Sequence, residues 1–351
     1  MNILVLNVGS SSIKYAVYNN LRLVEKKNIE RLYKREDRIS AINNIFFEIN
    51  KKGIRIDKIG HRIVHGLQYR KPMMITNEII KRLKKCIELA PLHEAPEIEV
   101  IEICCKLSKA KQYAVFDTGF FADIPETSKI YGLPYKYYKK GIIRYGFHGI
   151  SHRFVTNRLK GKVISCHLGS GASVAAVKNG KAIDMSMGFT PSEGLVMGTR
   201  TGNLDPSIIP YLIKHEKYSI KEINDMINNK SGLLGISGIS ADLRDLLLKE
   251  KSDKRAKLAV DVFVNRVVKY IGKYVAAMNG VDTIVFTAGI GERNAEIRKR
   301  ICSHLTFIGL ELDDHMNKAN DKVISKTSSK VKVMVVPTDE EKEIMVEVCR
   351  L

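Results

Sequence analysis

The stretch Asn7 to Lys14, NVGSSSIK, gathers backbone N–H groups, hydroxyls and a lysine within one short turn. Because a glycine lets the backbone approach a ligand closely and a lysine neutralises charge, such a turn suits an anion such as a phosphate. It is not a P-loop, since the chain contains neither GxxxxGK[ST] nor GxGxxG. Taken alone, the turn fits an ordinary serine-rich hairpin equally well.

Three further side chains lie where an anion could be bound. Arg62 interrupts the apolar strand GHRIVHG, so it either pairs with a buried acid or faces a ligand. His148 stands between glycines in RYGFHGISH, and these glycines predict a loop that points one donor. Arg200 lies in the segment 186–206, which is rich in Gly, Thr and Pro and is therefore expected to be a loop. The alternative for Arg200 is a plain surface arginine.

The candidate acids are few. Asp117 ends a predicted strand in VFDTG, where α/β sheets place residues that face ligands. Asp242 and Arg244 follow a glycine-rich run. Glu340 and Glu341 open the last predicted helix, where first-turn acids interacting with the helix dipole are the alternative. The chain has no GxSxG, HExxH or EF-hand pattern.

The opening hairpin that must position these residues occurs twice. Residues 3–25 predict strand, Gly-Ser turn, strand, Asn-Asn turn and strand, and residues 163–185 repeat that order at the same spacing. Gly9-Ser10 aligns with Gly169-Ser170. We interpret the repeat as an internal duplication that gives two similar lobes, each with one hairpin facing phosphate.

Strands followed by helices in both halves predict an α/β fold, with a ligand in the cleft between the lobes at the turns that follow the strands. Pro96 is expected to open a helix, and Asp205-Pro206 to start another as N-cap and first residue. The remaining patterns predict helices at 31–53, 76–89, 97–107, 254–279, 294–305 and 339–351, and strands at 58–64, 112–116, 282–287 and 332–336.

The composition narrows the class of protein. The 351 residues carry a formal net charge of +20, but the basic residues are spread along the chain and do not alternate with aromatics. A lysine-rich solvated surface is therefore favoured over a nucleic-acid binder. The six cysteines show no CxxC spacing, which predicts reduced thiols and a cytoplasmic protein. No apolar run approaches the roughly 20 residues of a membrane span.

Nine motifs, in order along the whole chain, resemble those of the acetate kinase family (acetokinases) within the actin-like (ASKHA, ribonuclease H-like) superfamily. They are NVGSSSIKY, GHRIVHG, APLH at 90–93, VFDTGF, YGFHGISH, HLGSGASVAAVKNGKAIDMSMGFTPSEGLVMGTRTG, KSGLLGISG at 230–238, FTAGIGE at 286–292 and VPTDEE at 336–341. The resemblance implies reversible, Mg-dependent, in-line transfer of the γ-phosphoryl group of ATP to acetate, giving acetyl phosphate and ADP. It also implies a homodimer without nucleic-acid or membrane partners.

The resemblance assigns expected roles to residues of this chain. Asn7 and Glu340 would hold Mg²⁺, with Mn²⁺ as an alternative, and the catalytic residues would be Asp117, His148 and Arg200. The carboxylate substrate and its methyl group would be bound by Arg62, Val64, Leu92, Phe147 and Pro191. The ATP site would comprise Ser10, Ser12, Lys14, His167, Leu168, Gly169, Ser170, Gly171, Asp242, Leu243, Arg244, Gly289, Ile290, Gly291, Glu292 and Arg293.

The resemblance also implies a division of the chain. Residues 1–119, closed by about 338–351, would form the lobe for acetate, Mg²⁺ and phosphate, and residues 120–337 the lobe for the nucleotide. Ile150, Ser170, Leu67, Phe121 and Arg293 depart from the usual family residues, which leaves acetate or propionate preference and nucleotide preference open. Propionate or butyrate kinase activity, a chaperone-like ATPase and a basic nucleic-acid binder are the alternatives.

Overall fold

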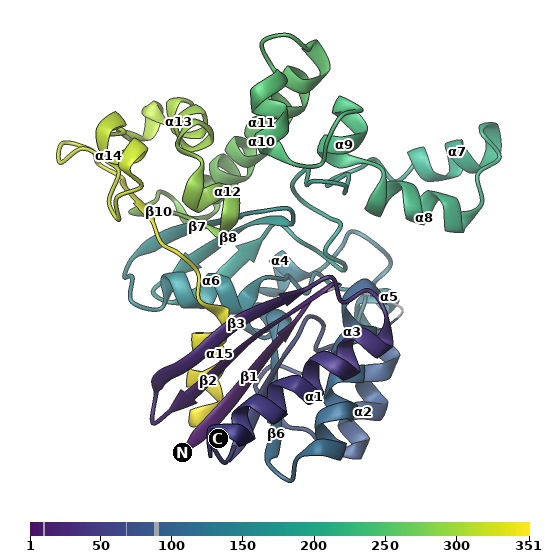
Figure 1. Ribbon diagram of the computed structural model, residues 1–351. Helices are drawn as coiled ribbons and strands as arrows, with labels where there is room; N and C mark the ends of the chain where they lie inside the picture. The colour runs from purple at the N-terminus through teal and green to yellow at the C-terminus, as the bar shows by residue number, and fades with distance from the viewer. Residues whose placement is uncertain (10, 68, 88–90) are drawn as a thin grey trace. The chain divides into compact units, whose positions relative to one another are not determined.

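The computed structural model describes residues 1–9, 11–67, 69–87 and 91–351. The chain forms two compact units, each built on one sheet (Figure 1). The first unit comprises Met1–Asp123, Phe147–Phe154 and Asp339–Leu351, and the second comprises Ile124–Gly146 and Val155–Thr338. The boundaries predicted from the sequence assign 147–154 to the other half of the chain. Here Ile150 packs in a core cluster of the first unit with Ile344 of the C-terminal helix.

The first unit contains a six-stranded sheet in the order β3-β2-β1-β4-β6-β5. Its strands are β1 (Asn2–Val8), β2 (Ser12–Asn19), β3 (Arg22–Glu30), β4 (Lys58–Ile63), β5 (Met73–Met74) and β6 (Lys111–Phe116). Its helices are α1 (Arg35–Lys51), α2 (Asn77–Leu83), η1 (Lys84–Cys86), α3 (Pro91–Leu107), η2 (Asp117–Phe121), α6 (Gly149–Thr156, which ends in the second unit) and α15 (Glu340–Cys349).

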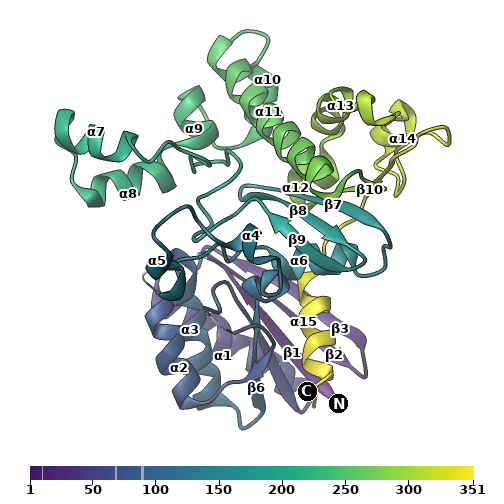
Figure 2. The same cartoon turned by 180° about the vertical axis from the view of Figure 1, so that it is seen from behind.

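Alternation along β1 gives this sheet two apolar faces. Leu4 and Leu6 point to a cluster formed with α1 and α3, whereas Ile3 and Val5 point to a cluster formed with α15. Figures 1 and 2 show α1 and α3 on one side of the sheet and α15 on the other. A strand buried on both faces explains why its sequence is almost continuously apolar.

The second unit contains a five-stranded sheet in the order β11-β10-β7-β8-β9. Its strands are β7 (Lys162–Leu168), β8 (Ala172–Lys178), β9 (Lys181–Met185), β10 (Thr283–Thr287) and β11 (Lys332–Val335). Its helices are α4 (Glu126–Lys129), α5 (Tyr135–Lys139), α7 (Ile208–His215), α8 (Ile220–Asn229), α9 (Gly232–Ser237), α10 (Leu243–Lys249), α11 (Lys254–Met278), α12 (Ala288–Arg293), α13 (Ala295–Ser303), η3 (Thr306–Ile308) and α14 (Asp314–Ala319).

The two sheets repeat one topology, as the duplication predicts. In each, an antiparallel three-stranded meander is followed by two parallel strands, so β3-β2-β1-β4-β6 matches β9-β8-β7-β10-β11. The second and third strands of each meander also contain a matching irregularity, between Val17 and Tyr18 and between Ala176 and Val177. A shared β-bulge is a specific feature of a fold, which strengthens the case for duplication.

The predicted equal spacing of the two hairpins is wrong by one residue. The first hairpin turn lies at Asn20 and Leu21, not at the Asn-Asn pair, and the second lies at Asn179 and Gly180. All four residues have positive φ, as a two-residue turn between twisted strands requires. The register shows the cause, because Val8 pairs with Ile13 in the first copy whereas Leu168 pairs with Ala172 in the second.

Two predicted helix starts are also wrong. Pro96 lies inside α3, which begins at Pro91, so Pro91 occupies the position where a missing N–H costs nothing. Helix α7 begins at Ile208 with Ser207 as its N-cap. The carboxylate of Asp205 instead accepts the N–H of Ser207 at 2.8 Å, in a turn before the helix. Among the described residues, no helix combines the length and apolar character that a membrane span needs.

Candidate active site

The buried centre of the first unit is the guanidinium of Arg62, on β4. Its Nη2 donates to Asp117 Oδ2 at 2.5 Å, and its Nε lies 3.7 Å from Glu340 Oε2. The sequence left open whether Arg62 pairs with an acid or faces a ligand, and the structure supplies the acid. Parallel pairing of β4 with β6 sets the geometry, since Asp117 directly follows β6.

Asn7, at the end of β1, links this arginine to the start of α15. Its Nδ2 donates to Glu340 Oε2 at 2.9 Å and to Glu341 Oε1 at 2.8 Å, and its Oδ1 lies 3.5 Å from Arg62 Nη1. Lys26 of β3 pairs with the other oxygen of Glu341 at 2.8 Å. Residues that are more than 300 positions apart in the sequence therefore form one polar cluster.

In this cluster, burial and the neighbouring opposite charges shift the pKa values in opposite directions. Burial lowers the pKa of Arg62, but Asp117, Glu340 and Glu97 outweigh it, so the net pKa lies above the usual value and the arginine stays charged. Burial raises the pKa of Asp117, and the neighbouring guanidinium works against that rise. Arg62 therefore stays charged, and its direct ion pairs in the described part of the chain are those with Asp117 and Glu340.

The structure describes some of the side chains that are proposed to form the apolar wall of the substrate site. Val64 is 3% exposed and Phe147 is 2% exposed, and the Phe147 ring meets the His65 ring edge-on at 5.6 Å between centroids. The side chain of Leu92 and the whole of Ser10 lie outside the described residues. Pro191 belongs to the second unit.

Four consecutive backbone N–H groups in the turn that follows β4 donate hydrogen bonds to side chains. The N–H of Val64 donates to Glu97 Oε2 at 3.0 Å, and that of His65 donates to Glu94 Oε1 at 2.5 Å. The next two donate to Thr118 Oγ1 and to His65 Nδ1. No local sequence pattern marks Glu94, Glu97 or Thr118 as functional, so these residues were not predicted.

His148 lies at the start of α6 with φ of 56°, and its carbonyl accepts the N–H of His152 at 2.9 Å. The predicted loop is confirmed for Gly146 to His148 and is wrong from Gly149 onward, because Gly149 is the first residue of a helix. A Cβ on Gly149 would lie 1.9 Å from the carbonyl oxygen of Asp117. The glycine is required for this close approach and not for loop flexibility.

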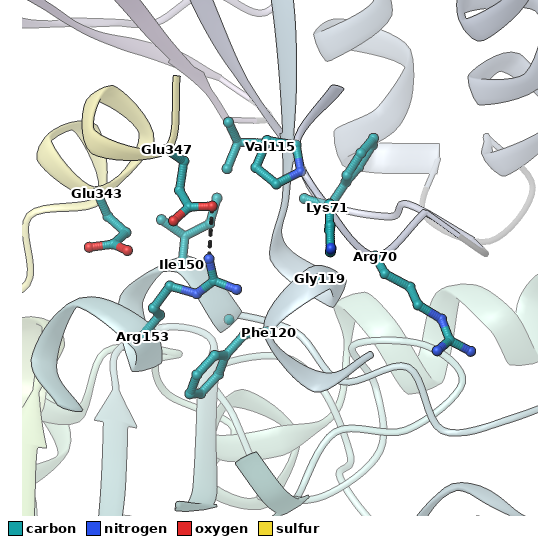
Figure 3. Close-up of a pocket in the computed structure, with 12 residues that line it drawn as sticks. Arg70, Lys71, Val115, Gly119, Phe120, Ile150, Arg153, Glu343 and Glu347 are labelled. Carbon is teal, nitrogen blue, oxygen red and sulfur yellow. Dashed lines mark ion pairs between the residues drawn. The ribbon is translucent and has the colours of Figure 1, made fainter. Parts of the chain in front are cut away.

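A small pocket of the first unit lies beside η2, which contributes Gly119 and Phe120 to its lining (Figure 3). Arg153 and Glu347 form an ion pair at 2.9 Å across it, and Ile150, Gly119 and Phe120 line it. Its volume of about 10 Å³ holds no more than a water molecule, so it is not a substrate site.

In the second unit, Arg200 is partly buried without an acid beside it. Its Nη1 donates to the carbonyl of Pro191 at 3.3 Å and lies 3.8 Å from Met197 Sδ. Within the described part of the chain no carboxylate forms an ion pair with it, and burial alone lowers its pKa. An unneutralised, half-desolvated guanidinium favours an anionic ligand.

The loop that carries Arg200 and Pro191 is fixed by a cluster that the sequence analysis missed. The carboxylate of Glu193 pairs with Arg144 and accepts the hydroxyl of Tyr131. Arg144 also donates to the carbonyl of Met185 at 2.6 Å. These contacts fix the conformation of a segment that its composition predicts to be a loop.

The candidate nucleotide residues form three groups in the second unit. His167 and Leu168 end β7, and the turn Gly169–Gly171 closes with the Gly169 N–H donating to the Gly171 carbonyl at 3.1 Å. Leu243 is buried, whereas Arg244 is exposed and bound to its neighbour Asp242 at 2.5 Å. Asp242 also caps α10, which is a structural role that the sequence did not indicate.

The third group, Gly289 to Arg293, forms α12 directly after β10. The carboxylate of Glu292 accepts the N–H of Ala288 at 2.9 Å and that of Thr338 at 3.1 Å. Buried Arg298 donates to the carbonyls of Gly291 at 2.8 Å and Glu292 at 2.9 Å. Glu292 therefore fixes the turn, and exposed Gly289 and Arg293, with half-buried Ile290, remain the candidates for ligand contact.

Ser12 and Lys14 belong to β2 of the first unit, and Lys14 is exposed. The donors around Asn7 and Glu340 are carboxylate and amide oxygens, which suit Mg²⁺. Among the described residues no group of three or more His, Cys, Asp and Glu side chains forms a complete cage. Mg²⁺ is usually held by one or two carboxylates together with waters and substrate phosphates.

The duplicated sheets define a class of protein, the two-lobed α/β proteins with the actin-like fold. The acetate kinase of Porphyromonas gingivalis superposes with a TM-score of 0.89 and 37% identity, over 99% of both chains. A propionate kinase from Francisella tularensis gives 0.89 and 39%, over 99% of this chain and 98% of that one.

The family follows from the sequence comparisons. The model of the acetokinase family matches residues 19–346. An acetate kinase of Treponema denticola is 46% identical over 97% of both chains, and one of Acetivibrio thermocellus is 43% identical over 100% of this chain and 99% of its own. The chain belongs to the acetokinase family, whose members are phosphotransferases with a carboxyl group as acceptor.

Proposed function

We propose that this protein is an acetate kinase that transfers the γ-phosphoryl group of ATP to acetate, reversibly and by direct in-line transfer. The observation that carries the proposal is the buried Arg62, held by Asp117 and Glu340 beside the apolar Val64. A fixed guanidinium next to a small apolar wall matches an acceptor that has one carboxylate and one methyl group.

Acetate needs no general base. Its pKa, near those of Asp and Glu at about 4, leaves it ionised at neutral pH. The obstacle is the repulsion between an anionic acceptor and an anionic phosphate. Asp117 therefore serves to hold Arg62 in place, and Arg200 and His148 serve to stabilise charge on the transferring phosphoryl oxygens.

Mg²⁺ would be held by Asn7 and Glu340 together with the nucleotide phosphates, with Mn²⁺ as an alternative. When bound, the ion neutralises phosphate charge and orients the γ-phosphoryl group. We assign the phosphates of ATP to the hairpin residues Ser12 and Lys14, and the rest of the nucleotide to the turns at 169–171 and 289–293. The role of the first unit is thus acceptor, metal and phosphate binding, and that of the second is nucleotide binding.

Propionate is the second candidate substrate, because a propionate kinase is 39% identical to this chain. One methylene in an apolar pocket is worth only about 1–3 kcal/mol, so both acids can be accepted to different degrees. Val64 and Phe147 are the side chains of the first unit that would set the limit on chain length.

One assay tests both candidates. Purified protein is incubated with Mg-ATP and acetate, propionate or butyrate, and hydroxylamine traps the acyl phosphate as a hydroxamate. We expect the highest kcat/KM with acetate and a loss of activity in EDTA that Mg²⁺ restores. ATP hydrolysis that does not depend on an acid, with no hydroxamate, would refute the proposal.

We also propose a homodimer, located in the cytoplasm. Helix α7 buries none of its residues, and Ile208, Tyr211 and Ile213 are 40–59% exposed. Ile220 of α8 is 78% exposed, and large apolar side chains left exposed on two consecutive helices are of the kind that interfaces cover. Light scattering should give a dimer that Tyr211→Glu dissociates, whereas Leu248→Glu, a change at an isolated exposed residue, should leave it intact.

The described cysteines are all free, which agrees with a reducing compartment.

A further inference from the structure

Two carboxyl groups on α3 are buried next to the proposed acceptor site. Glu94 is 0% exposed and Glu97 is 1% exposed. Each uses one oxygen to accept a backbone N–H of the turn after β4, from His65 and Val64 respectively. Their other oxygens, Glu94 Oε2 and Glu97 Oε1, have no hydrogen-bond partner in the described part of the chain.

The charges facing this pair come from few elements. Arg62 on β4 attracts both carboxylates, whereas Asp117 on η2 repels them, and they repel each other. His65 faces them through its backbone N–H. Two basic residues of neighbouring elements pair with other acids of α3, since Arg38 of α1 pairs with Glu99 and Lys84 of η1 pairs with Glu102.

With both glutamates ionised, the single charge of Arg62 would be shared among four carboxylates, including Asp117 and Glu340. A fifth carboxylate, that of the substrate, would then find little attraction there. A buried carboxylate without a full set of partners takes up a proton instead. In agreement, burial raises the pKa of Glu94 to about 8 and that of Glu97 well above its usual value.

We propose that Glu94 and Glu97 are positioning residues that fix the acceptor turn while both carboxyl groups are protonated, and that their neutrality keeps Arg62 available to the anionic substrate. The inference rests on the proposed function, in which Arg62 binds the acceptor carboxylate. Losing either proton places a negative charge beside the acceptor and weakens its binding, while ATP, assigned to other residues, is affected much less.

The test is the pH dependence of the Michaelis constants between pH 6 and 10, measured by a coupled assay of ADP release. The wild type and the control Glu102→Gln, on the exposed side of the same helix, should show a flat acetate KM up to about pH 8. Above that pH, KM should rise roughly tenfold per unit, the dependence of a site that fails when the first of its two protons is lost. The double variant Glu94→Gln/Glu97→Gln should stay flat within about threefold, because glutamine retains an acceptor oxygen but never ionises.

Substitution by alanine distinguishes the positioning role of the glutamate side chain from the effect of its charge. Glu97→Ala removes the acceptor for the Val64 N–H, so acetate KM should rise at every pH, and Glu97→Gln should restore it below pH 8. A second readout does not need activity. Because folding raises the pKa of these carboxyls, the folded state holds protons that the unfolded state releases, so wild-type stability should fall from about pH 5 to pH 8 relative to the double variant.

The possible results distinguish a failure of this inference from a failure of the proposed acetate kinase activity. If the wild type makes acyl phosphate but its acetate KM stays flat to pH 10, the inference is overturned and the function stands. If no short acid yields acyl phosphate at any pH, the proposed function fails, and the stability comparison then decides the protonation by itself. Should the glutamine variants not fold, the wild-type and Glu102→Gln profiles still decide.

Discussion

Gly149 offers the sharpest test of how the site is held together. A methyl group at this position would lie 1.9 Å from the carbonyl oxygen of Asp117 and 2.9 Å from the Cβ of Phe120. Ordinary van der Waals separations are about 3.5 Å. The Gly149→Ala variant must therefore displace the backbone of Asp117, the first residue of α6 or both by roughly 1.5 Å in total.

The displacement acts directly on the residue that holds Arg62. Asp117 Oδ2 accepts from Arg62 Nη2 at 2.5 Å, and a shift of about 1 Å in a positioned group costs on the order of 10²-fold in rate. We expect Gly149→Ala to lower kcat about a hundredfold and to destabilise the fold by about 1–3 kcal/mol, the usual range for overpacking. The KM for ATP should change little, because the residues that the added methyl group would meet, Asp117 and Phe120, are not among those assigned to ATP.

The matched control is Gly272→Ala in α11, where a Cβ meets nothing within 4 Å. There the same substitution should leave kcat unchanged and stabilise the helix by about 0.5–1 kcal/mol. Hydroxamate formation gives kcat, and thermal unfolding confirms that each variant is folded. A folded Gly149→Ala protein with kcat within threefold of wild type would refute the link between this close approach and catalysis.

The other substitutions probe one interaction each. Arg200→Ala should lower kcat by about two to three orders of magnitude, the typical cost of removing one electrostatic stabiliser, and near-wild-type kcat would contradict its role. Arg62→Ala should raise acetate KM and also cost about 3–5 kcal/mol of stability, measured by denaturant unfolding, because Asp117 would be left buried without its partner. Arg298→Leu should raise the KM for ATP more than that for acetate, since it frees the Gly291 carbonyl; equal effects on both constants would indicate general destabilisation.

Much of the fold could be predicted because local patterns determine it. The apolar run of β1, the glycine-serine turn and the repeated hairpin predict the start of both sheets. Other elements depend on distant partners and escaped prediction. The one-residue difference between the hairpins appears only in the strand register, and the position of Pro96 inside α3 depends on Pro91 having already opened the helix.

The candidate site was likewise predicted only where a local pattern marks the residue. The sequence marks Arg62 as unusual, but its partners Asp117 and Glu340 come from other elements of the fold. Glu94 and Glu97 were missed for a related reason. On sequence grounds they resemble the other acids of α3, which form ordinary ion pairs, and only the packing of α3 against the turn after β4 distinguishes them.

The opening hairpin was first interpreted as a phosphate-binding turn that supplies positive charge, and the structure changes what it is expected to do. At its end Asn7 lies among carboxylates, and the basic side chains of Arg62 and Lys26 are already paired with Asp117, Glu340 and Glu341. If all five side chains are ionised, the cluster carries a net charge of −1, and it would repel both substrates. A divalent cation at Asn7 and Glu340 reverses that sign. Mg²⁺ is therefore expected to serve acceptor binding as well as phosphate binding, because Arg62 can attract a further anion only when its acidic neighbours are neutralised by the metal or by protons.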